Sequence, residues 1–535
     1  MTTAESLGVP ERFNAAAYVI DRNVAEGRGS KIAIECGDER VSYDDLLRNV
    51  NRAGTALMRL GIRPEERVVL LMLDTPAFAY VFFGAIKIGA VPVPLNTLWK
   101  PADYAHAIAD SRAAAIVVSP ELRSSIDAIP PTGRTGLRPI ITNVDDLLSQ
   151  GAPTLEADAT HRDGPAFWLY SSGSTGAPKG CVHLQHDMVI CAELFGKGIL
   201  GIRESDRTFS VAKLFFAYGL GNALYFPLSV GATTILWPGA PAPQNVYAVI
   251  EKHRPTLFYS VPTGYAMMLA HHRGSPSGPE REVSAERNDF DLSSVRLAVS
   301  AGEALPAALY ERFKQRFAVD VIDGVGSTEA LHMFISNRPG AIRPGSSGLI
   351  VPGYDARILD DDRNPVAADD VGNLWISGDS VCDRYWNKHE KTKQTIEGNW
   401  IKTGDKYTQD ADGYYWYAGR SDDMLKVGGL WVSPIEVEGA LVAHPAVLEC
   451  GVVGCEDRDA LVKPIAFVVL REAGAATDEL ARSLQQFVRE RLAEYKRPRW
   501  VEFVSELPKT ATGKIQRFRL RELAERSNPG GRPPV

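Results

Sequence analysis

Residues 170–180, YSSGSTGAPKG, have the composition of a loop that binds phosphate. Small residues let successive backbone N–H groups turn toward one anion, and the hydroxyl groups and Lys179 add further donors. Pro178 and Gly180 flank this lysine, so the segment is not a Walker A loop. In isolation such a run is as often a plain surface turn. Its length and its Pro-Lys-Gly ending favour phosphate binding.

Three further motifs place a charged side chain beside glycine or hydroxyl-bearing residues. Glu329 follows a serine and a threonine, and a carboxylate of this kind suits Mg²⁺. Asp405, in Thr-Gly-Asp, suits the two hydroxyls of a ribose. Lys514, after a glycine, could bridge two anions. Taken singly, these residues are a solvated glutamate, a turn aspartate and a surface lysine.

Six short motifs occur in a fixed order along the chain. They are YSSGSTGAPKG at 170–180, SAGE at 300–303, DGVGSTE at 323–329, KTGD at 402–405, GRSDDMLKVGG at 419–429 and PKTATGKIQR at 508–517. Over about residues 12–520 the sequence resembles the acyl-adenylate-forming enzymes, which include acyl- and aryl-CoA ligases, adenylation domains and luciferases. The flanks GCVHLQHDM, LFFAYGLGN and GSTEALHMF, with WVSP at 431–434, are most similar to the benzoate-CoA ligases.

The resemblance implies an AMP-forming acid–thiol ligase that uses ATP, Mg²⁺ and coenzyme A. ATP would activate an aromatic carboxylate as an adenylate, with release of diphosphate, and coenzyme A would then take the acyl group. Both reactants of the first step are anions, so catalysis would depend mainly on charge neutralisation and positioning. Benzoate or a substituted benzoate is the favoured acid. The alternatives are 4-hydroxybenzoate, cinnamate or a fatty acid, or a free-standing adenylation enzyme that loads a carrier-protein thiol.

A nucleotide-binding sensor without catalysis is an alternative from a different class. The sequence keeps Lys179, Glu329, Asp405 and Lys514. A sensor could lose Lys514 freely, so the presence of all four residues favours an enzyme.

The resemblance assigns roles to individual residues. Adenylation would use Lys514, Thr328 and Glu329, with Glu329 as the Mg²⁺ ligand. ATP would contact Ser171, Ser172, Gly173, Ser174, Thr175, Gly176, Lys179, Gly302, Glu303, Asp323, Asp405 and Arg420. The acyl pocket would consist of Ala217, Tyr218, Gly326, His332 and Met333. Coenzyme A would pass Gly428, Gly429 and Trp431, and Asp422 matches the hinge of the C-terminal part.

One position departs from the pattern of the wider superfamily. Val325 stands where many members carry an aromatic residue that stacks on adenine. An aliphatic side chain still covers one face of the purine but loses the stacking, and it suits the benzoate-type branch.

His183 and His186 have the HxxH spacing of many metal sites. With no carboxylate or third ligand nearby, packing or a substrate-side role is favoured over metal binding.

Alternating strands and helices must position these residues. Apolar residues recur at helical spacing over 43–60, and apolar strands are expected at 67–73, 91–94, 114–118, 233–236, 257–261 and 297–300. This alternation predicts an α/β protein with helix-covered parallel sheets. Short strands after about residue 345 predict a small β-rich layer. We expect an N-terminal domain at 1–420 and a smaller, mobile α+β domain at 421–535.

Composition narrows the class of protein. The 66 acidic and 59 basic residues give a net charge of −7, and 45% of residues are hydrophobic, which excludes disorder of the bulk chain and disfavours nucleic acid as the main partner. The uncharged stretch between residues 213 and 251 is broken by glycine and proline, which predicts buried core and no membrane span. Six cysteines without CxxC spacing, and an N-terminus without signal-peptide character, predict a cytoplasmic protein. The resemblance adds a homodimer, which the residues themselves leave open.

Overall fold

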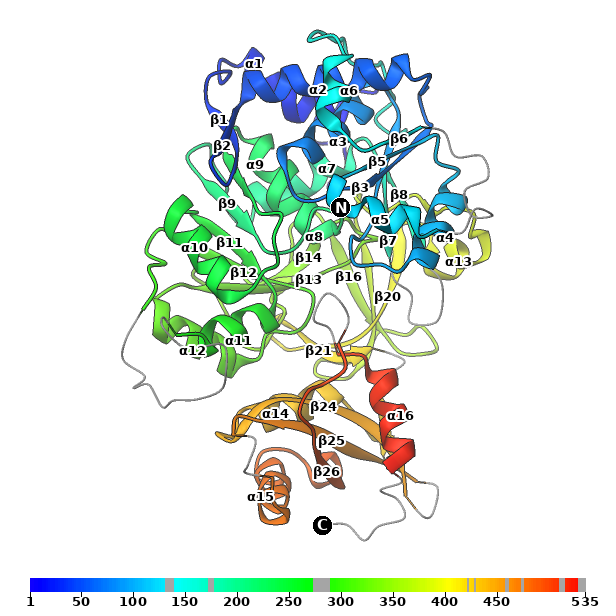
Figure 1. The fold of residues 1–535 in the computed structure, drawn as a ribbon. Helices are drawn as coiled ribbons and strands as arrows, with labels where there is room; N and C mark the ends of the chain where they lie inside the picture. The colour runs from blue at the N-terminus through cyan, green and yellow to red at the C-terminus, as the bar shows by residue number, and fades with distance from the viewer. Residues whose placement is uncertain are drawn as a thin grey trace.

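The structure is a computed structural model that describes residues 1–129, 139–171, 178–272, 289–420, 423–427, 430–457, 461–472, 476–509 and 515–527. Strands and helices alternate through the first 340 or so residues, and shorter antiparallel strands follow. Figure 1 shows a large N-terminal part, with a smaller part below it that the C-terminal residues form. This is the α/β fold class expected from the sequence.

Among the helices, the one over Tyr43–Arg59 lies where the apolar spacing predicts it. Those of the N-terminal part are α1 (Arg22–Ala25), α2 (Tyr43–Arg59), α3 (Pro76–Lys87), α4 (Pro101–Ser111), α5 (Arg123–Asp127), α6 (Val144–Ser149), α7 (Asp187–Cys191), α8 (Ala217–Leu220), α9 (Phe226–Ser229), α10 (Pro243–His253), α11 (Pro262–Ala270), α12 (Ala307–Phe317) and α13 (His389–Thr395). The π-helical segments are η1 (Ala17–Asp21), η4 (Ala192–Lys197) and η5 (Gly221–Tyr225), and a 3₁₀ turn is η2 (Pro120–Leu122). Within the described ranges, no helix has both the length and the apolar character needed to cross a membrane.

The largest sheet has nine strands. Their order is β15 (Leu349–Ile350), β14 (Met333–Ser336), β13 (Val321–Gly326), β12 (Leu297–Ser300), β11 (Leu257–Ser260), β9 (Arg207–Ser210), β10 (Thr233–Leu236), β1 (Ile32–Cys36) and β2 (Glu39–Ser42). From β1 to β13 neighbouring strands are parallel, and the pairs at the two edges are antiparallel. Parallel strands need crossover connections, which α10, α11 and α12 supply. The carboxyl ends of β12 and β13 carry two of the motifs.

Three smaller sheets complete the N-terminal part. One is parallel, with the order β4 (Val91–Pro94), β3 (Arg67–Leu71), β5 (Ala115–Val118) and β6 (Ile140–Ile141). A second is antiparallel, with the order β18 (Arg384–Tyr385), β8 (Lys179–Leu184) and β7 (Pro165–Ser171). The third is the expected β-rich layer, with the order β16 (Asp355–Leu359), β17 (Gly372–Ser377), β20 (Trp400–Gln409) and β19 (Ile396–Glu397), in which β21 (Tyr415–Arg420) also pairs with β20.

The C-terminal part is a small α+β unit. Its strands are β22 (Leu425–Val427), β23 (Leu430–Val432), β24 (Val447–Glu456), β25 (Val462–Leu470) and β26 (Trp500–Phe503). Its helices are α14 (Pro434–Val442), α15 (Asp478–Arg489) and α16 (Arg517–Ser527), with a 3₁₀ turn η6 (Glu494–Lys496). Helices α14 and α15 share one apolar cluster with the β24–β25–β26 sheet, and α16 contributes to another. The unit therefore has its own core.

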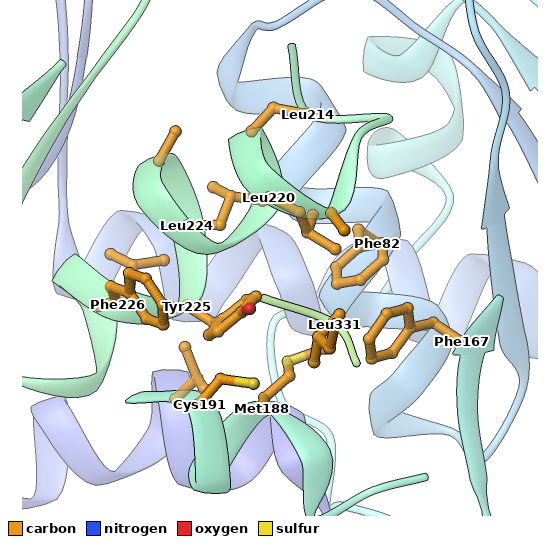
Figure 2. Packing of buried hydrophobic residues seen from close by; sticks show 14 of the residues in the cluster. Phe82, Phe167, Met188, Cys191, Leu214, Leu220, Leu224, Tyr225, Phe226 and Leu331 are labelled. Carbon is orange, nitrogen blue, oxygen red and sulfur yellow. The ribbon is translucent and has the colours of Figure 1, made fainter. Parts of the chain in front are cut away.

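The main core lies under the uncharged stretch 213–251. Figure 2 shows Leu220 and Leu224 packed near Phe82, with Tyr225 and Phe226 on the same segment. Leu331, which follows the DGVGSTE motif, reaches into this cluster beside Phe167 (Figure 2). Residues 214–236 are thus almost entirely buried core, as predicted, whereas 237–245 are half-buried or exposed. Leu331 anchors the end of a chemistry-bearing motif in this core.

Candidate active site

The phosphate-loop candidate joins the antiparallel strands β7 and β8. Their register places Ser171 opposite Lys179, so the segment leaves and re-enters the sheet at one point. Lys179 Nζ lies 4.5 Å from the centre of the Tyr385 ring, within cation–π range. The two ends of the segment, Ser171 and Lys179, therefore lie next to each other at the edge of the β7–β8 pair. Five expected ATP contacts lie outside the described residues: Ser172, Gly173, Ser174, Thr175 and Gly176.

Glu329 lies in the turn between β13 and β14, against the ends of β7 and β18. Its Oε1 accepts hydrogen bonds from Ser171 Oγ at 3.1 Å and from the Tyr385 hydroxyl at 2.8 Å. Burial, followed by the charge of Glu329, raises the pKa of Tyr385, so this hydroxyl stays protonated and can donate. Both bonds fall on Oε1. Within the described residues, Oε2 is therefore the oxygen available to a ligand.

The backbone around Glu329 is held at three successive carbonyl groups. The Thr328 carbonyl accepts a hydrogen bond from His183 Nε2 at 2.8 Å. The carbonyls of Glu329 and Ala330 accept from the Cys382 amide at 2.7 Å and from Ser380 Oγ at 2.8 Å. We call residues 327–332 the Glu329 turn. Its three carbonyl groups are held by donors from β8 and from the segment before β18.

Leu331 in this turn has a left-handed backbone, with φ of 65°. Such a conformation costs a non-glycine residue about 1–2 kcal/mol. The Leu331 side chain is fully buried in the main core. Burial of a leucine contributes roughly 1.5–3 kcal/mol, which offsets the backbone cost. The turn is thus held in a strained shape by the core beneath it.

Asp405 and Arg420 face each other on β20 and β21, where their register pairs them. Arg420 Nη1 donates to Asp405 Oδ1 at 2.8 Å and to the Thr403 carbonyl at 3.2 Å. Gly404, which directly precedes Asp405, has φ of 76°, and a Cβ there would lie 2.9 Å from Arg420 Nη2. The left-handed backbone favours glycine at this position, and the absence of a Cβ leaves room for the guanidinium.

Asp323 is buried near the end of β13, the strand that leads to the Glu329 turn. Its Oδ2 accepts from the Leu305 amide at 3.2 Å, whereas Oδ1 is buried without a hydrogen-bond partner among the described residues. Burial raises the pKa of this carboxyl to about 8. A buried acceptor without a donor is costly, and an amino group of a ligand would remove that cost.

The SAGE segment lies directly after β12, beside Asp323. Gly302 has φ of 93°, a conformation suited to glycine. Glu303 accepts a hydrogen bond from Thr263 Oγ1 of α11 at 3.5 Å. The segment thus turns sharply at the carboxyl end of a parallel strand, where α/β proteins bind their ligands.

The expected acyl-pocket residues come from two segments that meet. Tyr218 of α8 donates to the Val299 carbonyl at 3.0 Å, and its ring centre lies 5.7 Å from that of His332. A Cβ on Gly326 would lie 2.5 Å from the His332 carbonyl oxygen, so the close approach of these two backbones requires glycine. Ala217 and Met333 are both buried, at the start of α8 and of β14 respectively.

His332 stays neutral in this aromatic setting. Burial lowers the pKa of its ring to about 3. The rings of Phe195 and Phe226 lie 5.1 and 4.5 Å from it, and its Nε2 is 3.1 Å from Asn222 Oδ1. The Nδ1 of His332 and the Nδ2 of Asn222 are buried without hydrogen-bond partners in the described part of the chain. The wall is therefore aromatic, with a few polar atoms, which suits a flat apolar ligand.

Electrostatic interactions connect these groups in space. Burial, then Asp405, and more weakly Asp323, raise the pKa of the Tyr407 hydroxyl. Partial burial lowers the pKa of Arg420, but the charges of Asp405 and, more weakly, Glu329 raise it above its usual value. The carboxylates of three separate motifs therefore lie close enough to act on shared neighbours.

The C-terminal candidates are less fully described. Lys514, Asp422, Gly428 and Gly429 lie outside the described residues. Trp431 lies in β23, opposite Lys426 of β22. The link between the two parts includes Asp423, which accepts from Arg521 of α16 at 2.9 Å.

Sequence reasoning missed some of the groups around Glu329. Tyr385 belongs to none of the six motifs, and no local pattern marks it or Ser380. The statement that His183 has no carboxylate nearby was wrong: its Nδ1 lies 2.8 Å from Asp187 Oδ2. The i, i+4 spacing of His183 and Asp187 was visible in the sequence. Pairing across the junction of β8 and α7 brings them together.

Comparisons with known proteins agree with this geometry. Residues 21–386 match the AMP-binding enzyme family, and residues 436–514 match the AMP-binding enzyme C-terminal domain. The chain is 48% identical to a benzoate–CoA ligase of Thauera aromatica, over 97% of this chain and 98% of that protein.

Two solved structures are also similar. The anthranilate CoA ligase AuaEII in complex with anthranoyl-AMP has a TM-score of 0.91 and 45% identity, covering 98% of this chain and 99% of that one. A benzoate CoA ligase from Burkholderia xenovorans LB400 has a TM-score of 0.86 and 46% identity, covering 95% of this chain and 100% of that one. With motifs, fold and site in agreement, the chain belongs to the AMP-binding enzyme family.

Proposed function

We propose that this protein is an ATP-dependent aryl-CoA ligase. It converts benzoate or a substituted benzoate and coenzyme A into the aryl-CoA thioester, AMP and diphosphate, through an aryl-adenylate. The observation that carries the proposal is the arrangement of Glu329, Ser171 and Tyr385 next to the aromatic wall of Tyr218 and His332. Support also comes from relatives that are benzoate and anthranilate CoA ligases and match almost the whole chain.

In the adenylation step the protein aligns two anions. The acid carboxylate attacks the α-phosphate of ATP, and diphosphate leaves. Ser171–Lys179 hold the outer phosphates, Thr328 donates to the α-phosphate, and Lys514 neutralises the attacking carboxylate. These groups act through charge and position, which is the main source of catalysis when both reactants are anionic.

Other residues would bind the ribose and the adenine of ATP. Asp405 accepts hydrogen bonds from the ribose hydroxyls, with Arg420 beside it. Gly302, Glu303 and Asp323 hold the adenine, whose amino group would satisfy the buried Asp323 Oδ1. Val325 covers one face of the purine.

The residues present fit Mg²⁺ bound together with ATP. Within the described ranges no group of three or more His, Cys, Asp or Glu side chains forms a metal cluster. Mg²⁺ commonly uses one or two carboxylates together with phosphate oxygens and water. Glu329, with Oε2 available and Oε1 held by Ser171 and Tyr385, provides such a carboxylate. When bound, the ion supplies positive charge to the phosphate oxygens.

The aryl ring would lie against Ala217, Tyr218, Gly326, His332 and Met333. A neutral His332 adds no charge to this wall. Shape and ring contacts therefore favour a flat aromatic acid over a flexible chain.

The thioester step requires a second arrangement of the chain. We place the boundary between the N-terminal domain, 1–420, and the C-terminal domain, 421–535, with Asp422 as the hinge. Rotation about it would withdraw Lys514 and bring Gly428, Gly429 and Trp431 to the pantetheine arm of coenzyme A. A homodimer is part of the same proposal.

An acid panel with both half-reactions measured tests the function. Diphosphate release would be followed with benzoate, hydroxybenzoates, 2-aminobenzoate, cyclohexane carboxylate and medium-chain acids, in the presence of coenzyme A. We expect the aromatic acids to be preferred. Lys514→Ala should nearly abolish adenylation and spare thioester formation from supplied benzoyl-adenylate. A preference for the chain acids, or equal loss of both steps in a folded variant, would contradict the proposal.

A further inference from the structure

His183 is a fully buried residue of β8 that contacts the Glu329 turn from within the protein. Its Nε2 lies 2.8 Å from the Thr328 carbonyl oxygen, and its Nδ1 lies 2.8 Å from Asp187 Oδ2. Both side chains are 0% exposed. Since a carbonyl oxygen can only accept, the Nε2 contact with Thr328 is a hydrogen bond that the ring donates.

The orientation of this ring is itself fixed by its neighbours. Phe167 stacks on it, with ring centres 5.2 Å apart and planes 20° apart. Asp187 Oδ2 also accepts from the Leu184 amide at 3.1 Å, and Asp187 Oδ1 lies 3.3 Å from His186 Nε2. The stacked Phe167 ring and the contact with Asp187 together orient the imidazole so that its Nε2 faces the Thr328 carbonyl.

We propose that His183 is a positioning residue for adenylate formation. By donating to the Thr328 carbonyl, it holds the peptide that connects Thr328 to Glu329, and so holds both side chains toward ATP and Mg²⁺. This inference rests on the proposed function and adds a residue to it. Within the described residues, His183 makes its two hydrogen bonds to the protein, so its action passes through the turn.

The energetic argument concerns the shape of the turn. Leu331 keeps a strained left-handed backbone only because the surrounding contacts hold it. The donors from Cys382 and Ser380 hold the carbonyls of Glu329 and Ala330, and His183 holds the first carbonyl of the series. The Thr328 carbonyl also accepts from the Leu331 amide within the turn, at 3.2 Å, so loss of the His183 bond removes its shorter contact and the one from outside the turn. Outer partners of this type commonly contribute 10–100-fold to metal affinity or activity.

Two substitutions at this position separate the bonds. In His183→Gln, the side-chain amide can occupy the place of Nε2 and still donate to Thr328. In His183→Asn, the shorter amide can reach Asp187 and not Thr328. We expect His183→Asn to lower the adenylation rate by about 10–100-fold and to weaken ATP–Mg²⁺ binding, measured by calorimetry, while thioester formation from supplied adenylate stays close to wild type. His183→Gln should recover most of both losses.

His253→Asn is the matched control. His253 is also buried and also pairs with a carboxylate, with Nδ1 2.8 Å from Glu35 Oε2, but it lies at the end of α10 away from the turn. Thermal unfolding of each variant gives the folded fraction. Equal adenylation rates per folded protein and equal ATP–Mg²⁺ affinities in His183→Asn and His253→Asn would overturn the inference.

Two further arms keep the test decisive. If His183→Asn does not fold, Asp187→Asn keeps the imidazole but removes the carboxylate that orients it, which weakens its hydrogen bond to Thr328. The inference then expects weakened ATP–Mg²⁺ binding, and wild-type affinity would overturn it. The calorimetric comparison needs no acid substrate. A wild-type enzyme that activates no acid in the panel would therefore refute the proposed function, and the calorimetry would still test the role of His183.

Discussion

The Glu329 turn and the Asp405–Arg420 pair present carboxylates to the same region in different ways. The turn is held at three carbonyl groups and at Oε1 of its glutamate, by donors from β7, β8 and the segment around β18. Arg420, in contrast, is the last residue of β21, and its side chain is 45% exposed. Multiply bonded groups suit the reacting phosphate, where small displacements matter. An exposed strand end suits binding, and it adjoins the C-terminal part, which the proposed thioester step requires to move.

The largest effect should come from Glu329→Gln. The amide keeps an oxygen that can accept from Ser171 and Tyr385, so the turn should hold its shape, but the charge offered to Mg²⁺ is lost. We expect diphosphate release to fall by about 10²–10³-fold in single-turnover measurements, with the thermal midpoint near that of wild type. A loss below tenfold at saturating Mg²⁺ would show that Glu329 is not a metal ligand. It would also contradict the contrast between the Glu329 turn and the Asp405–Arg420 pair.

A smaller effect, of a different kind, should follow from Asp405→Asn. The ribose hydroxyls lose a charged acceptor, and Arg420 loses its charged partner. We expect the KM for ATP to rise by about tenfold, with a lesser change in kcat, because a hydrogen bond to a charged group contributes about 1.5–3 kcal/mol. Steady-state kinetics over a range of ATP concentrations measure both constants. The distinction between a reacting site and a binding site would collapse if kcat fell as far as in Glu329→Gln at unchanged KM.

At the buried Asp323 we expect an effect on stability and its pH dependence. Its pKa in the folded protein, about 8, is above the unfolded value of 3.8. The folded state therefore binds more protons between these values, and stability falls as pH rises through this window. Asp323→Asn should remove a slope of about 1.4 kcal/mol per pH unit, so its thermal midpoint should gain on wild type from pH 5 to pH 8. A constant difference between the thermal midpoints of the variant and wild type from pH 5 to pH 8 would contradict the raised pKa of Asp323.

The sequence predicted the elements better than the contacts between them. Apolar spacing located α2, and the predicted strand positions matched β3, β4 and β10, because periodic burial is a local property. The cross-strand pair of Asp405 and Arg420 depends on a register shift between residues 406 and 407, which no local pattern encodes.

The groups that support the site show the same limit. Tyr385 contacts Glu329 because β18 pairs with β8, a three-dimensional relation between segments about 200 positions apart. His183 was visible as part of an HxxH spacing, but its proposed role depends on Thr328, which lies in the turn between β13 and β14 of another sheet. Motif residues could thus be named from the sequence, and the residues that hold them could not.

The position of Leu331 links the thermal stability of the protein to its proposed adenylation activity. One residue is both a side chain of the main core and the end of the turn that carries Glu329. Glycine there would relieve the backbone but empty part of the core, and a larger residue would disturb the packing that keeps the turn closed. Heat that loosens this core must therefore disorder the catalytic turn in the same event. We therefore expect the stability of this core and the rate of adenylation to fall together when the protein is heated or Leu331 is substituted.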